Sequence, residues 1–289
     1  MLHFVHRALV DESSDSFLTE YACVSLVLVA AVQIGACLAV RSGRPQRAFE
    51  AASGASVALV CVVTLLMRGT YFPRQVLVTL LMVLWGVRLS WHLYTKPVDA
   101  TGQDVAVRTV WAVTCAMPAV TCTVAQHTRF HTTRLELACA AAALLSILLE
   151  AAADVQKQRW HRLRAGAARP DRSSSEPPVC ADGLWALSRH PNVFFELVFH
   201  WAVYLIVRPV EAPWVVVCPI LLSVFVFLLP GGVASMELER SRLYGLHLSY
   251  LRYRDVTPVL FPLPWAKQAL ADRAPHLESC LCLELPVFQ

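Results

Sequence analysis

Gly183-Leu-Trp-Ala-Leu-Ser-Arg-His-Pro-Asn-Val-Phe-Phe-Glu196 is the stretch around which the rest of this chain is most readily interpreted. Its last eight positions contain a cation, an imidazole, an amide and a carboxylate, and it lies where a basic loop meets a long apolar run. Polar and charged groups at the edge of a membrane are costly unless they have a partner or a bound ligand. The stretch therefore predicts a polar site at the start of a membrane helix.

The composition is that of an integral membrane protein. The chain has 289 residues, of which 56% are hydrophobic and 16% charged, and its mean hydropathy is +0.51. Soluble domains carry about 25% charged residues. The net charge of +4 comes from basic residues in loops, which suits an anionic membrane surface or ligand and does not indicate a nucleic-acid groove.

The apolar residues form runs rather than amphipathic stripes, so we expect an all-α, polytopic bundle of about seven transmembrane helices. A span needs about 20 residues, and shorter runs of about 17 also qualify. The candidate runs are 20–40, 51–67, 75–94, 109–125, 135–153, 193–209 and 213–230. We divide the chain into an N-terminal segment 1–19, one membrane domain 20–265 with a motif-rich half 150–265, and a tail 266–289.

The basic residues predict the orientation of the chain. They concentrate in alternate loops, and most strongly in the segment from Lys157 to Arg189 and in the C-terminal segment after Arg240. Cytosolic loops carry the excess of Lys and Arg. We therefore expect a lumenal N-terminus, a cytosolic C-terminus and residence in the endoplasmic reticulum, with no cleaved signal peptide.

Other segments are less informative. Seven of the ten cysteines fall inside apolar runs, and no disulfide framework or metal-ligand spacing is visible. We expect residues 154–164 to extend the fifth helix, 165–178 to be disordered because they are rich in Arg, Ser and Pro, and 233–253 to form a polar, amphipathic helical stretch ended by prolines.

Each residue at the heart of the quoted stretch has a plausible task in binding an anion. Arg189 can clamp a phosphate with paired hydrogen bonds, and His190 can donate to phosphate or transfer a proton near neutral pH. Pro191 suits the first turn of a helix, whose amides attract anions. Asn192 offers a donor and an acceptor for a carboxamide or ribose, and Glu196 could accept from a ribose hydroxyl or hold Arg189.

A simpler interpretation is a helix start capped by Ser188, with the basic residues at the level of the lipid headgroups. The sequence pattern alone leaves these two interpretations open. In the expected topology further ionisable residues reach the same membrane face, although Glu50 and Arg88 taken alone are more simply explained by structural pairing. These residues are Glu50, Arg88, Glu150, Asp154 and Glu237.

Residues 183–196 resemble the signature of membrane proteins related to the C-terminal domain of steroid 5-alpha-reductase, in particular a branch of unknown function. Three other segments agree with this resemblance over roughly residues 50–265. They are Leu84-Trp-Gly-Val-Arg-Leu-Ser-Trp-His-Leu93, Glu150-Ala-Ala-Ala-Asp-Val-Gln-Lys157, and the closing pattern from Glu237 through Tyr244-Gly245, Tyr250, Tyr253 and Thr257 to Pro262.

The resemblance implies a multi-helix membrane fold with a cofactor cavity that faces the cytosol. It implies NADPH as the cofactor, which passes a hydride to an activated carbon–carbon double bond of a lipid that enters from the bilayer, whether steroid, polyprenol or enoyl lipid. It does not identify the proton donor. The cofactor-binding residues that it implies are Arg189, His190, Asn192, Glu196, Glu237 and Tyr253, supported by Arg88, Glu150 and Asp154.

Two positions depart from the family pattern and keep other functions open. Val193 stands where the family has Tyr, and Phe195 stands where it has Gly, so Phe195 could narrow the site or face lipid. The first alternative is an S-adenosylmethionine-dependent membrane methyltransferase of the isoprenylcysteine or phospholipid type, which shares a similar C-terminal half. The second is a membrane scaffold without catalytic activity.

Overall fold

The protein is described by a computed structural model that covers residues 2–42, 46–95, 105–126, 133–164, 177–210, 213–228, 232–265 and 267. These residues form helices and turns without a strand, so the all-α prediction is confirmed. Contacts divide the chain into two compact units. Unit 1 contains Met1–Ile147 and Val198–Ser223, and unit 2 contains Leu148–Leu197 and Val224–Gln289.

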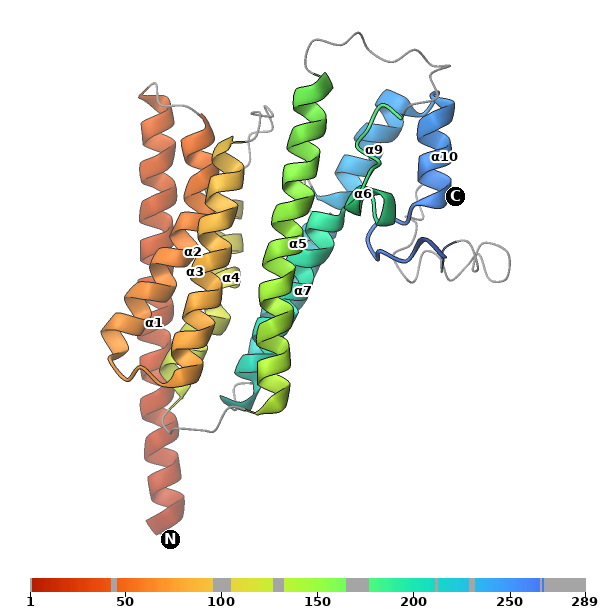
Figure 1. Cartoon of the computed structure of the whole chain (residues 1–289). Helices are drawn as coiled ribbons and strands as arrows, with labels where there is room; N and C mark the ends of the chain where they lie inside the picture. The colour runs from red at the N-terminus through yellow and green to blue at the C-terminus, as the bar shows by residue number, and fades with distance from the viewer. Residues whose placement is uncertain are drawn as a thin grey trace. The chain divides into compact units, whose positions relative to one another are not determined.

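Unit 1 is built on four helices that lie side by side (Figure 1). They are α1 (Leu2–Arg41), α2 (Gln46–Arg68), α3 (Pro73–Thr95) and α4 (Val105–Ala125). The first part of α5 (Arg134–Arg164) and the second part of α7 (Pro191–Val207) also belong to it. The short helices η1 (Arg208–Val210) and η2 (Pro213–Val216) and the first part of α8 (Val217–Leu228) complete the unit.

Six helices in the described part of the chain are long and apolar enough to cross a membrane, so the multi-pass prediction is confirmed. They are Thr19–Arg41, Arg47–Arg68, Pro73–Thr95, Val105–Ala125, Arg134–Arg164 and Pro191–Val210. The seventh apolar run begins with the tight turns of η2, and its apolar helix, Pro213–Phe227, is shorter than the other six. Orientation and organelle stay predictions.

Small residues let α2 and α3 approach closely, as is common between membrane helices. A Cβ atom added to Gly54 would lie 2.4 Å from the carbonyl oxygen of Gly86, and one added to Gly86 would lie 2.7 Å from that of Gly54. Gly86, the glycine of the Leu84–Leu93 segment, therefore serves the packing of α3 against α2.

A buried ion pair connects α3 and α5 in this unit, since Arg74 Nη2 lies 2.8 Å from Glu136 Oε1.

Unit 2 contains the end of α5, the start of α7, the end of α8, and three short helices. These helices are α6 (Leu184–Leu187), α9 (Val233–Tyr244) and α10 (Leu248–Val256). The prediction that α5 continues to Arg164 is confirmed. The expected helical stretch 233–253 is divided, because the chain turns at residues 245–247, where the His247 amide donates to the Tyr244 carbonyl. Residues 165–176 of the expected disordered loop, and most of the tail 266–289, lie outside the described residues.

An apolar core in unit 2 joins α7, α8, α9 and the residues after α10. Its buried residues are Val193, Leu197, Val233, Val259 and Leu260. Val193 is 9% exposed in this cluster. An aliphatic side chain thus suits the position where the family resemblance led us to expect Tyr.

Candidate functional site

The segment 183–190 is held on one side by α5. The indole Nε1 of Trp185 donates to the carbonyl of Ala153 at 2.9 Å, and the side-chain oxygen of Gln156 accepts from the Leu184 amide at 3.0 Å. Gly183 has φ +62°, which L side chains rarely adopt. The family motifs at 150–157 and 183–196 are therefore parts of one structure.

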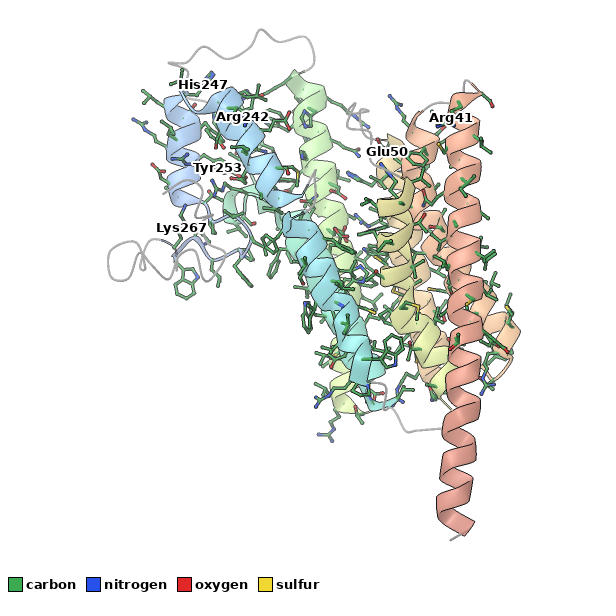
Figure 2. The ribbon with its side chains drawn as sticks, turned by 180° about the vertical axis from the view of Figure 1, so that it is seen from behind. Arg41, Glu50, Arg242, His247, Tyr253 and Lys267 are labelled. Carbon is green, nitrogen blue, oxygen red and sulfur yellow. The ribbon has the colours of Figure 1, made fainter. Side chains whose placement is uncertain are left out.

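On its other side the segment is tied to α10 and to the residues that follow it. Tyr253 donates from its hydroxyl to the Trp185 carbonyl at 2.7 Å, and Ser188 donates to the Leu260 carbonyl at 2.8 Å. The Arg189 amide donates to the Pro258 carbonyl at 2.9 Å. These bonds explain why the closing pattern of the family accompanies the central signature, and Figure 2 labels Tyr253 on α10.

Arg189 and His190 converge on the carboxylate of Glu237 in α9. Arg189 Nη1 lies 3.1 Å from Glu237 Oε2, and His190 Nε2 lies 2.7 Å from Glu237 Oε1. Arg240, one turn along α9, places Nη1 3.4 Å from the same Oε1 and donates to the Arg189 carbonyl. We call Arg189, His190, Glu237 and Arg240 the buried charge cluster.

The cluster changes the interpretation of the signature. Arg189 and Glu237 are 0% exposed and His190 is 1% exposed, so these side chains do not reach the lipid headgroups as the simpler interpretation required. Ser188 does receive a hydrogen bond from the His190 amide, next to the start of α7 at Pro191. Two guanidinium groups and one imidazole therefore meet at the carboxylate of Glu237.

Burial and charge fix the protonation states of the cluster. Burial, together with the charge of Arg240, lowers the pKa of His190 to about 4 despite the neighbouring carboxylate. Burial alone would raise the pKa of Glu237, but the hydrogen bond from His190 and the charges of Arg189 and Arg240 hold it at about 2. At pH 7 a neutral His190 therefore donates its Nε2 proton to an ionised Glu237.

This arrangement predicts loss of stability in mild acid. The pKa of His190 in the folded protein, about 4, lies below its ordinary value of 6.5, so the unfolded chain binds the proton more readily as the pH falls through that window. Between pH 7 and pH 5 we expect a loss of about 2 kcal/mol from this residue. Thermal unfolding across this range should show a shallower pH dependence in His190→Gln. His161→Gln is the matched control, because His161 is exposed, and it should keep the pH dependence of the unchanged protein. An unchanged pH dependence of the melting temperature in His190→Gln would contradict the lowered pKa of His190.

The two polar side-chain atoms of Asn192 have different surroundings. Its Nδ2 donates to Asp154 Oδ1 at 3.4 Å, while its Oδ1 is buried without a hydrogen-bond partner among the described residues. The Asn192 side chain and Glu196 are half-buried, whereas Glu150 and Asp154 are buried. The ammonium of Lys157 lies 5.1 Å from the centre of the Trp185 ring. The half-buried residues Asn192, Glu196 and Lys157 form the accessible edge of the site.

Arg88, an expected supporting residue, and Glu50, expected only at the same membrane face, belong to unit 1, so their convergence with unit 2 stays a prediction. Glu50 lies at the same end of the α1–α4 bundle as Arg41 (Figure 2). It also interacts electrostatically with Arg108, whose Nη1 donates to Ser53 at 3.2 Å. This is a structural pairing of the kind that the simpler interpretation of Glu50 anticipates.

Sequence reasoning missed Arg240 and Lys157 as members of the site. Arg240 could have been found by helical spacing, because it lies one turn after Glu237. Lys157 stands inside the family segment 150–157, but the sequence pattern did not indicate a role for it.

Phe195, the second departure from the family pattern, is half-buried, with its ring centroid 5.2 Å from that of Phe194.

One comparison with known proteins gives a match. The model of a family described as "Protein of unknown function (DUF1295)" matches residues 40–106 and 105–257, which is well over half of the chain. The matched ranges include three of the four sequence segments discussed above, the closing segment as far as Thr257, and every residue of the buried charge cluster. Neither the curated proteins nor the solved structures gave a match.

Proposed function

The chain belongs to the DUF1295 family of proteins of unknown function, and we propose that it is a membrane-bound reductase that uses NADPH to reduce an activated double bond of a lipid. The resemblance of residues 183–196 to the steroid 5-alpha-reductase signature supports this class of reaction. The multi-pass helical fold suits a substrate that reaches the protein from the bilayer. Steroid, polyprenol and enoyl-lipid double bonds all fit the proposal.

The observation that carries the proposal is the buried Oδ1 of Asn192, which has no hydrogen-bond partner among the described residues. Arg240, which contacts the carboxylate of Glu237, and Lys157, beside Trp185, are half-buried cations in the same unit. NADPH is a polyanion with three phosphate groups, whereas S-adenosylmethionine carries a positively charged sulfonium and an ammonium. Half-buried cations that can bind phosphate, together with an acceptor for a carboxamide at Asn192, therefore support NADPH over the methyltransferase cofactor.

The residues of unit 2 can be given different tasks on the basis of burial. Arg189, His190 and Glu237 are fully buried, so they position the segment 183–190 and contribute charge rather than direct contacts. The half-buried side chains of Asn192, Glu196 and Arg240 are the groups that would contact NADPH, together with Lys157. The unsatisfied Oδ1 of Asn192 suits the N–H donors of a carboxamide.

Tyr253 supports the site through a hydrogen bond to a backbone carbonyl rather than through contact with NADPH. Burial raises the pKa of its phenol well above the usual range, so the hydroxyl stays protonated and keeps its hydrogen bond to the Trp185 carbonyl. Bound NADPH would supply the hydride, and the protein would hold the nicotinamide in place. The expected orientation puts this site on the cytosolic side, where NADPH is available.

Cofactor-induced stabilisation of the purified full-length protein in detergent tests the proposal. We expect NADPH to raise the melting temperature and S-adenosylmethionine to leave it unchanged, because a ligand that binds the folded state stabilises it by mass action. Asn192→Ala should weaken NADPH binding about tenfold, the effect of losing one or two hydrogen bonds. Arg240→Gln should weaken it similarly and reduce its dependence on salt.

Arg242→Gln is the matched control, since Arg242 lies two residues further along α9 and is exposed. It should bind NADPH as the unchanged protein does. Stabilisation by S-adenosylmethionine would replace the reductase with the methyltransferase. Failure of both cofactors to shift the melting temperature would favour a scaffold.

A further inference from the structure

Two large aromatic side chains in unit 1 carry buried nitrogen atoms that the described residues leave without hydrogen-bond partners. They are Trp85 on α3, through Nε1, and His200 on α7, through both Nδ1 and Nε2. Trp85 is 0% exposed and His200 is 2% exposed. A buried polar group without a partner is rare in native proteins, so three such atoms on two touching rings require an explanation.

The two rings form one cluster with other aromatic side chains. His200 meets Trp85 edge to face, with ring centroids 4.7 Å apart and an interplanar angle of 79°. Phe199 stacks on Trp85 at 5.5 Å, and Trp111 of α4 lies 5.9 Å from Trp85. The surroundings of the three nitrogen atoms are therefore apolar and aromatic.

Both residues lie near the middle of a candidate span. Trp85 stands close to the midpoint of α3, which runs from Pro73 to Thr95, and His200 stands at the midpoint of the span Pro191–Val210. At this depth lipid tails offer no hydrogen-bonding group. Polar side chains at mid-membrane are expensive and usually serve a function.

Contacts within the cluster satisfy only part of this hydrogen-bonding capacity. The edge-to-face geometry allows one N–H of His200 to point toward the Trp85 ring, but such contacts are weaker than conventional hydrogen bonds. Neutral histidine has one donor and one acceptor nitrogen, and tryptophan has one donor. The indole N–H and the second nitrogen of His200 would still be unmatched.

We propose that Trp85 and His200 form a binding site for the oxygen of a hydroxyl or carbonyl group on an otherwise apolar, membrane-soluble molecule. One hydroxyl oxygen can accept from the Trp85 N–H while its proton is donated to His200. A carbonyl oxygen can accept from the Trp85 and His200 N–H groups together. The neighbouring rings of Phe199 and Trp111 suit the hydrocarbon part of such a molecule.

The site is closed in this structure, because the nitrogen atoms have almost no accessible area. Binding therefore requires the rings of Trp85 and His200 to part, and the ligand replaces an unsatisfied state with a satisfied one. Functional sites commonly retain polar groups that weaken the unliganded protein. This inference rests on unit 1 alone and does not depend on whether unit 2 binds NADPH.

The test measures melting temperatures of the full-length protein in detergent, without NADPH, in the presence of three oxygen-bearing probes. These are cholesterol, geranylgeraniol and progesterone, with cholestane as a sterol-like hydrocarbon that lacks the oxygen. We expect at least one oxygen-bearing probe to raise the melting temperature, and cholestane to have no effect. The variant His200→Phe keeps a ring but removes both nitrogen atoms, so it should abolish that shift.

The same variant separates a binding site from a structural role. His200→Phe should raise the melting temperature of the lipid-free protein by about 2–8 °C, because it removes unsatisfied buried nitrogen atoms. Trp111→Phe, the matched control, should keep the response to the probe. The proposal is overturned if no oxygen-bearing probe shifts the melting temperature. It is also overturned if His200→Phe melts lower or fails to fold, since the nitrogen atoms would then have structural partners such as a buried water.

Discussion

Glu237→Gln is expected to destabilise unit 2 by about 3–5 kcal/mol, the usual cost of removing one partner from a buried ion pair. The carboxylate of Glu237 contacts Arg189, Arg240 and His190. Glutamine has nearly the same shape but no charge. Arg189, which is fully buried, would then keep its charge in the protein interior without the carboxylate of Glu237.

Thermal unfolding of the purified protein in detergent measures this loss. Glu239→Gln is the matched control, because Glu239 lies on the same helix and is exposed, and surface substitutions usually change stability by less than about 0.5 kcal/mol. The double variant Glu237→Gln with Arg189→Met should recover part of the loss, since it also removes the buried charge that Glu237 faces. Equal melting temperatures for the two single variants would show that the cluster does not stabilise the fold.

The helices of this protein could be predicted from the sequence because their cause is local. Long apolar runs specify spans, and Pro191 specifies the start of α7. The continuation of α5 to Arg164 follows from polar residues that keep the helical pattern after the span. The run 213–230 was harder to interpret, because length and hydropathy do not reveal that its first turns adopt the tighter geometry of η2.

The partners within the site could not be predicted in the same way. The sequence pattern predicted that Arg189 binds a phosphate, whereas in the structure Arg189 forms an ion pair with Glu237, 48 positions further along the chain. The sequence marked both residues as polar and out of place near a membrane, but it contained no measure of their distance. Burial was equally hidden, and burial is what separates the positioning residues from Asn192, which keeps an unsatisfied oxygen.

The two departures from the family pattern, Val193 and Phe195, lie in different surroundings and therefore have different consequences. Val193 lies in the apolar core of unit 2, so its aliphatic side chain stabilises the contact between α7 and the residues after α10. Its presence alone therefore gives little reason to expect lost activity. Phe195 is half-buried, so the question of a narrowed or altered site now rests on this residue.

Gly54→Ala and Gly86→Ala are each expected to destabilise unit 1 by about 1–3 kcal/mol, the usual cost of overpacking. The new Cβ of Gly54→Ala would lie 2.4 Å from the backbone carbonyl oxygen of Gly86, and a backbone atom cannot rotate away as a side chain can. The helices α2 and α3 would have to separate. That movement would weaken the packing on which closely spaced membrane helices depend.

Gly35→Ala in α1 is the matched control, because a Cβ atom there meets nothing within 4 Å, so it should melt at the temperature of the unchanged protein or slightly above it. Combining Gly54→Ala with Gly86→Ala should cost less than the sum of the two single losses. Both substitutions disrupt the same contact, and the helices need to separate only once. Strictly additive losses, or a Gly54→Ala variant as stable as Gly35→Ala, would show that α2 and α3 do not meet at these two glycines.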